Sequence, residues 1–83
     1  MLLAFYVQSK LGEQMKRAEA VTLLKELFAQ QLIQPSLVLI EQRSPDAYQL
    51  QIKGIYNLQE IEMFVKDRFY LEENKGYLVF NKS

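Results

Sequence analysis

The sequence predicts a small α+β domain in which short strands alternate with two amphipathic helices. Two observations lead to this prediction. First, the chain contains four short apolar segments separated by stretches of helical periodicity, and they span residues 2–8, 37–42, 48–53 and 77–82. Second, of these segments only residues 48–53 alternate cleanly between apolar and polar side chains, as a strand with one wet face should. The strands that do not alternate should therefore be covered on both faces, and a partner would provide the cover on the second face.

The first half of the chain is predicted to form a strand followed by a helix. Residues 2–8 are rich in aromatic and β-branched side chains, which suit a pleated surface. From about Gln14, apolar residues recur every three or four positions, which predicts a helix. Its expected buried stripe is Ala20, Val21, Leu24, Leu27, Phe28 and Leu32. Pro35 should end this helix, because proline disfavours helical geometry at the residue before it.

The middle of the chain is predicted to form a β-hairpin. Residues 37–42 and 48–53 flank Pro45 and Asp46, which favour a turn. In the second of these strands one set of alternating side chains is apolar and should face the helices, namely Tyr48, Leu50 and Ile52. The alternate set should point away from the helices, namely Gln49, Gln51 and Lys53.

The last third of the chain is predicted to form a second helix and a final strand. Asn57 and Glu60 have the spacing of a capping box, so the helix should begin there. Its expected buried stripe is Leu58, Ile61, Phe64, Val65 and Phe69. Residues 72–76 should then turn the chain into the strand at 77–82.

The resulting order is βαββαβ, a ferredoxin-like arrangement in which two helices cover one face of a four-stranded antiparallel sheet. All 83 residues form a single domain in this interpretation. The first and third strands would be central, which makes residues 37–42 an edge strand that is apolar on both faces. The order becomes αββαβ if residues 1–14 are not part of the sheet. A third alternative extends the first helix backwards through Leu3, Val7 and Leu11, but Gly12 argues against it.

Composition narrows the function classes. The chain has ten basic and ten acidic residues, so it lacks the strong field that attracts nucleic acid or an anionic membrane. It contains no cysteine and no histidine, which removes thiolate chemistry, the commonest general base and the commonest transition-metal ligand. We therefore expect a protein that is not an enzyme and uses no cofactor or metal. The opening residues lack the pattern of a signal peptide or a membrane span, so we expect a cytoplasmic protein with no membrane partner.

The open face of the sheet and the edge strand at 37–42 are the candidate interaction surface. By alternation, the side chains expected there are Ala4, Tyr6, Leu37, Leu39, Gln49, Gln51 and Val79. Such a mixture of apolar, aromatic and amide groups is typical of protein interfaces. The leading hypothesis is an interaction or regulatory module that forms a homodimer or docks a larger protein.

Two alternative functions have less support from the sequence. A weak RNA or single-stranded DNA binder would use the basic residues Lys16, Arg17, Arg43 and Lys53. Nucleic acid is an unlikely partner, because neither central strand contains the basic-Gly-aromatic string of an RNA-recognition module. A regulatory domain that binds a small ligand at a dimer interface has a similar topology, with a loop such as that at Gly12 after its first strand. Because one fold hosts many functions, topology alone is poor support for this alternative.

Overall fold

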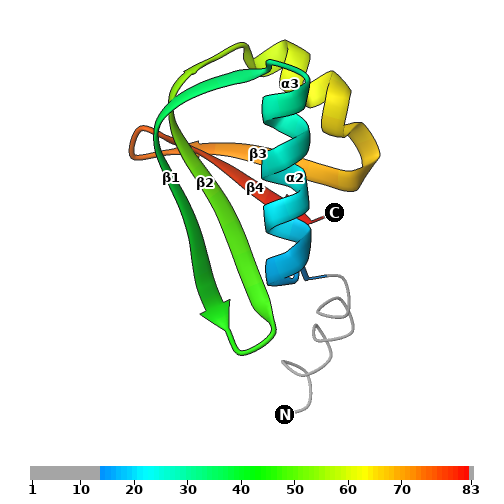
Figure 1. The fold of residues 1–83 in the computed structure, drawn as a ribbon. Helices are drawn as coiled ribbons and strands as arrows, with labels where there is room; N and C mark the ends of the chain where they lie inside the picture. The colour runs from blue at the N-terminus through cyan, green and yellow to red at the C-terminus, as the bar shows by residue number, and fades with distance from the viewer. Residues whose placement is uncertain (1–13, 83) are drawn as a thin grey trace.

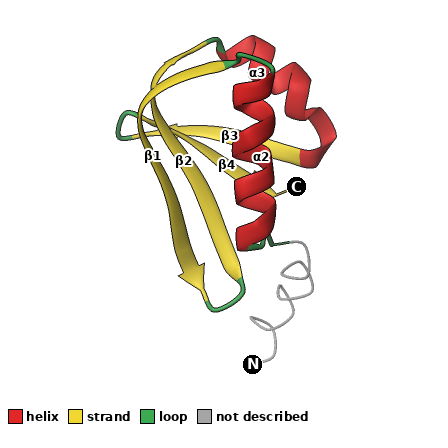
Figure 2. Ribbon diagram, in the orientation of Figure 1, coloured by secondary structure: helices red, strands yellow, loops and turns green. Residues whose placement is uncertain are grey.

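The computed structural model describes residues 14–82, which form an α+β fold with a four-stranded antiparallel sheet (Figure 1). The elements in chain order are α2 (Arg17–Ala29), β1 (Ile33–Ser44), β2 (Ala47–Tyr56), α3 (Leu58–Val65), the 3₁₀ turn η2 (Lys66–Arg68), β3 (Phe69–Asn74) and β4 (Tyr77–Lys82). The order is thus αββ followed by αββ. Figure 2 shows the two helices against the twisted sheet.

The strands are arranged in the order β1-β2-β4-β3. Each αββ unit contributes one antiparallel hairpin, and the two hairpins meet where β2 pairs with β4. The pairing within the first hairpin is long, whereas β2 and β4 pair only where Leu50, Gln51 and Ile52 lie opposite Phe80, Val79 and Leu78. This arrangement leaves β1 and β3 as the two edges of the described sheet.

The hydrophobic core lies between the helices and one face of the sheet. Alternate residues of the two central strands point into it and are fully buried, namely Leu50, Ile52, Leu78 and Phe80. Helix α2 contributes Ala20, Leu23 and Leu27, and α3 contributes Ile61 and Val65. Because both helices share this one core, the opposite face of the sheet is free of them.

The ferredoxin-like βαββαβ order is wrong for the described residues. That order places the first strand between the strands at 48–53 and 77–82, but β2 pairs directly with β4. The last strand, predicted to be an edge, is therefore central. Residues Phe69–Asn74, predicted as the end of a helix and a turn, form the edge strand β3 instead. The αββαβ alternative matches the order of the described elements from α2 to α3 but lacks β3. The strand predicted at residues 2–8 lies outside the described residues.

The first helix is shorter than predicted, and its buried face is rotated. It ends at Ala29, before Pro35, because Gln31 adopts a left-handed conformation with a φ of 57°. The amide of Leu32 then donates to the carbonyl of Leu27 and caps the open end of the helix. Pro35 itself lies in β1. Leu23 rather than Phe28 completes the buried stripe, and Phe28 is half exposed.

Several local predictions are confirmed. The hairpin at 37–42 and 48–53 is present within β1 and β2, and residues 37–42 lie on an edge strand. Leu50 and Ile52 face the helices, as their alternation predicts. Asn57 caps α3, since its Oδ1 accepts a hydrogen bond of 3.0 Å from the amide of Glu60.

A tyrosine at the end of β2 should make the fold less stable at alkaline pH. The Tyr56 hydroxyl donates a 2.5 Å hydrogen bond to Oε2 of Glu73. This bond, burial and the carboxylate charge raise the pKa of Tyr56 to about 12. An unfolded tyrosine titrates near pH 10. Because the folded state holds this proton to a higher pH, the free energy of unfolding should fall as pH rises from about 10 to 12.

We expect Tyr56→Phe to weaken this pH dependence, which urea denaturation at pH 8 and pH 11 would measure. The variant has no phenolic proton at this site to lose, so its loss of stability between the two pH values should be smaller than that of the wild type. Glu73→Gln should act in the same direction by removing the charged acceptor. An identical alkaline loss in all three proteins would contradict the assignment.

Candidate interaction surface

Strand β1 presents an open edge of 12 residues on one side of the sheet. On the face away from the helices, Leu37 and Leu39 expose 43% and 39% of their surface. On the helix side, Val38 and Ile40 are only half buried. An edge strand also carries backbone N–H and C=O groups that no neighbouring strand satisfies. Within residues 14–82, this edge therefore combines backbone groups that no other strand pairs with apolar side chains on both faces.

Irregularities at both ends limit the part of β1 that could receive another strand. The register with β2 shifts between Pro35 and Leu37 and again between Gln42 and Ser44. Proline has no N–H to donate, and a bulge bends a strand away from regular pairing. The regular segment between these irregularities, residues 37–42, coincides with the segment that the sequence singles out.

The open face of the sheet has a mostly polar centre. Pairing places Leu39, Gln51, Val79 and Glu72 in one row across the four strands. Val79 exposes only 4% of its surface although it lies on this face, since longer polar side chains flank it. The exposed apolar side chains on this face include Leu37 and Leu39 on β1 and Tyr70 on β3.

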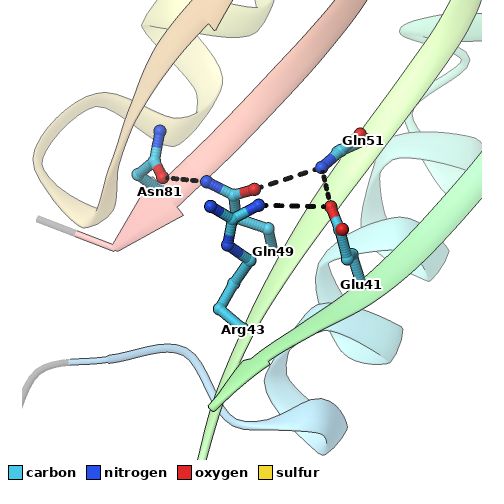
Figure 3. A network of polar contacts seen from close by, with 5 residues as sticks. All are labelled: Glu41, Arg43, Gln49, Gln51 and Asn81. Carbon is cyan, nitrogen blue, oxygen red and sulfur yellow. Dashed lines mark hydrogen bonds and ion pairs between the residues drawn. The ribbon is translucent and has the colours of Figure 1, made fainter.

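A chain of polar side chains crosses the open face from β1 to β4 (Figure 3). Gln51 Nε2 donates to Oε1 of Glu41 at 2.6 Å and to Oε1 of Gln49 at 3.1 Å. Gln49 Nε2 in turn donates to Oδ1 of Asn81 at 2.8 Å. Arg43 forms an exposed ion pair with the same Glu41 oxygen at 3.4 Å.

The Glu41 carboxylate determines which group of each side-chain amide donates a hydrogen bond and which accepts one. A carboxylate only accepts hydrogen bonds, so Gln51 must present its amide nitrogen to it. Gln49 must then accept from Gln51 with its oxygen and donate with its nitrogen, which leaves the Asn81 nitrogen at the end. Asn81 Nδ2 is buried and has no partner among the described residues. The amides at the centre of the face are thus mostly engaged with one another, which leaves them little to offer a binding partner.

A shallow groove of about 310 Å³ lies over this polar centre. Its lining comes from β1, β2 and the β3–β4 hairpin and includes Glu41, Arg43, Gln51, Glu72 and Lys75. The lining charges are of both signs, so the groove selects for neither an anion nor a cation.

A second groove, of about 510 Å³, lies on the helix side between α2 and the start of β3. It contains two ion pairs, Glu19 with Lys82 and Glu26 with Arg68. Burial alone would raise the pKa of Glu19. Hydrogen bonds from Lys82 and from the Lys16 amide outweigh burial and, with both charges, hold that pKa below its usual value. These pairs connect the first helix to the second half of the chain, which is a structural role.

The four basic residues proposed for nucleic-acid binding do not form one patch. Lys16 and Arg17 lie at the start of α2. Arg43 is paired with the carboxylate of Glu41. Lys53 lies near the opposite end of the β1–β2 pair and is placed 5.5 Å from the centre of an aromatic ring on β4. The arrangement therefore gives no continuous basic path for a phosphate backbone.

The structure brings five of the predicted interface residues to one face of the sheet, namely Leu37, Leu39, Gln49, Gln51 and Val79. Ala4 and Tyr6 lie outside the described residues. The residues of this face that sequence reasoning missed include Glu41, Tyr70 and Asn81. Alternation could have found Glu41 in residues 37–42 and Asn81 in residues 77–82, whereas Tyr70 follows only from the pairing of β3 with β4.

Other kinds of site find little support in the described part of the chain. Residues 14–82 contain no cluster of three or more acidic side chains able to hold a metal ion. Neither α2 nor α3 is long and apolar enough to cross a membrane. Comparison of the chain with protein-family models, with curated proteins and with solved structures finds no match.

Proposed function

We propose that the protein is a non-enzymatic interaction module that binds an extended polypeptide by strand addition at the edge of β1. In this binding mode, backbone hydrogen bonds provide affinity, and alternate side chains provide selectivity. The observation that carries the proposal is the regular edge segment at residues 37–42, with exposed Leu37 and Leu39 on one face and half-buried Val38 and Ile40 on the other. A suitable partner strand has apolar residues on both faces at its centre.

The two edges of the sheet differ in ways that favour β1. Edge strands commonly avoid unwanted pairing through short length and exposed charges. Strand β3 has both features, since it is 6 residues long and carries Glu72 and Glu73 in exposed positions. Strand β1 is twice that length and has no charged residue from Leu37 to Ile40. Its edge is therefore the one that can accept a second apolar strand without bringing like charges together.

A library of displayed twelve-residue peptides would test this function, because selection from it requires no known partner. We expect selection to enrich extended peptides with an apolar centre. Leu39→Lys should weaken their binding by about tenfold or more, because it places a charge at the centre of the buried strand. Fluorescence anisotropy with a selected peptide would measure the change.

Tyr70→Lys is the matched control, since Tyr70 is exposed on the same face but on the other edge strand. It should leave peptide affinity unchanged. Equal losses in both variants, or no enrichment of peptides, would count against strand addition at β1. Binding of a single-stranded oligonucleotide with affinity that falls steeply with salt would support the nucleic-acid alternative instead.

A further inference from the structure

We infer that the strand received by β1 is β1 of a second copy of this chain, paired antiparallel about a twofold axis at Leu39. This inference rests on the proposed function and names its partner. A twofold axis perpendicular to the sheet pairs each residue with one on the same face, so the axis must pass through a residue rather than between two. The open faces of the two copies would then form one continuous surface.

The ends of the regular segment allow an axis at Leu39 or at Ile40. The β1–β2 register shifts between Pro35 and Leu37 and again between Gln42 and Ser44, so regular pairing is limited to residues 37–42. An axis at Leu39 pairs residues 37–41 with the partner, and an axis at Ile40 pairs residues 38–42. An axis at Val38 would pair only residues 37–39.

The side chains favour the axis at Leu39. With the axis at Leu39, this residue lies opposite its own copy on the open face. On the helix side, Val38 lies opposite the partner's Ile40, and the symmetry repeats this pair. These residues are apolar, and Leu39 is exposed while Val38 and Ile40 are half buried in the single chain. An axis at Ile40 would leave one apolar pair, Ile40 with its own copy, and would place Val38 opposite the polar Gln42 of the partner subunit. Either axis places one leucine opposite the partner's Glu41. Apolar cross-strand pairs are the more stable arrangement.

Charges near the edge are complementary in this register. Glu41 lies opposite the partner's Leu37, and Lys53 is the β2 neighbour of Leu37 within each chain. The carboxylate of each copy therefore lies in the same row as the ammonium group of the other, with one leucine between them. Strands are about 5 Å apart, so these two long side chains can approach each other above the leucine. The symmetry makes this contact twice, and the chain has no net charge to oppose association.

Single cysteines at chosen positions test this register, because the natural chain has none. We expect the wild-type protein to form a dimer in sedimentation equilibrium and Leu39→Lys to weaken the dimer by about tenfold or more. Leu39→Cys should oxidise to a covalent dimer, since directly opposed residues on antiparallel strands lie within disulfide range. Leu37→Cys should not, because its own copy would lie about 13 Å away. A mixture of Leu37→Cys and Glu41→Cys proteins should cross-link to each other.

Tyr70→Cys is the control for random collision between exposed thiols and should form no covalent dimer after oxidation. A wild-type protein that stays monomeric at all accessible concentrations would overturn the inference, as would preferential cross-linking of Leu37→Cys over Leu39→Cys. If the protein stays monomeric, peptide selection on that monomer shows whether strand addition at β1 fails as well. A monomer that still binds peptides at β1 would retain the proposed function with a different partner.

Discussion

Replacing Phe80 by alanine is expected to reduce the free energy of unfolding by about 3–5 kcal/mol. Phe80 is fully buried on the central strand β4 and is paired with Leu50 of β2 and Leu71 of β3. Its ring thus lies where the two αββ units meet, and the surrounding core includes side chains from both helices. Because small domains are stable by only about 5–15 kcal/mol, the loss is a large fraction of the total.

Urea denaturation followed by circular dichroism would measure this loss. Tyr70→Ala is the matched control, because Tyr70 is an exposed aromatic residue on the neighbouring strand β3. It should change stability by about 0.5 kcal/mol or less. If the Phe80→Ala protein does not fold, Phe80→Leu keeps part of the buried volume and should show a smaller loss. A loss below about 1 kcal/mol for Phe80→Ala would mean that the joint between the units does not depend on this ring.

The local features of the fold could be predicted because their signals lie within a few residues of one another. The alternation from Tyr48 to Lys53 identified the face of β2 that packs on the helices. The spacing of Asn57 and Glu60 located the start of α3. In these places, the physical cause of the structure is contained in the segment itself, so long-range contacts were not needed.

Strand β3 was missed because its local pattern suits a helix as well as a strand. Phe69 follows Val65 by four residues, so it continues the helical stripe of α3. What makes residues Phe69–Asn74 a strand is their pairing with β4. The turn between β3 and β4 left a signal in the sequence. Lys75 and Gly76 both have positive φ, as a type I′ two-residue hairpin turn requires, and such turns favour glycine. A glycine between two runs of β-branched or aromatic residues could have suggested that hairpin.

For the candidate surface, the structure confirms that residues 37–42 lie on an edge strand, but it shows a more polar open face than the sequence predicted. The double-sided apolar pattern at residues 37–42 indicated an exposed edge, and β1 is an edge. The open face, however, was expected to carry a mixed apolar patch, whereas its centre is a chain of amides that cover Val79. Long polar side chains can cover an apolar neighbour by folding over it, and residue type alone does not predict this. The β1 edge is therefore a better candidate for the interaction surface than the open face.

Gly54→Ala is expected to destabilise the fold by about 3 kcal/mol or more, because the added methyl group would collide with the backbone of the edge strand β1. Gly54 lies opposite Pro35 where the β1–β2 register shifts, and its φ is +143°, a value that side-chain-bearing residues rarely adopt. An added Cβ would lie 2.6 Å from the Gln34 oxygen, 2.8 Å from Cα of Pro35 and 2.8 Å from the Ser36 nitrogen. All three are backbone atoms, so β1 itself would have to move away from β2.

Gly76→Ala separates the effect of this contact from that of backbone strain. Gly76 also has a positive φ, +86°, but an added Cβ would meet only the flexible Lys53 side chain at 3.5 Å. It should therefore lose only about 1–2 kcal/mol in urea denaturation. Amide exchange should also show reduced protection along β1 in Gly54→Ala but not in Gly76→Ala. Equal losses in the two variants would mean that the close approach of β1 to Gly54 adds nothing to the cost of backbone strain.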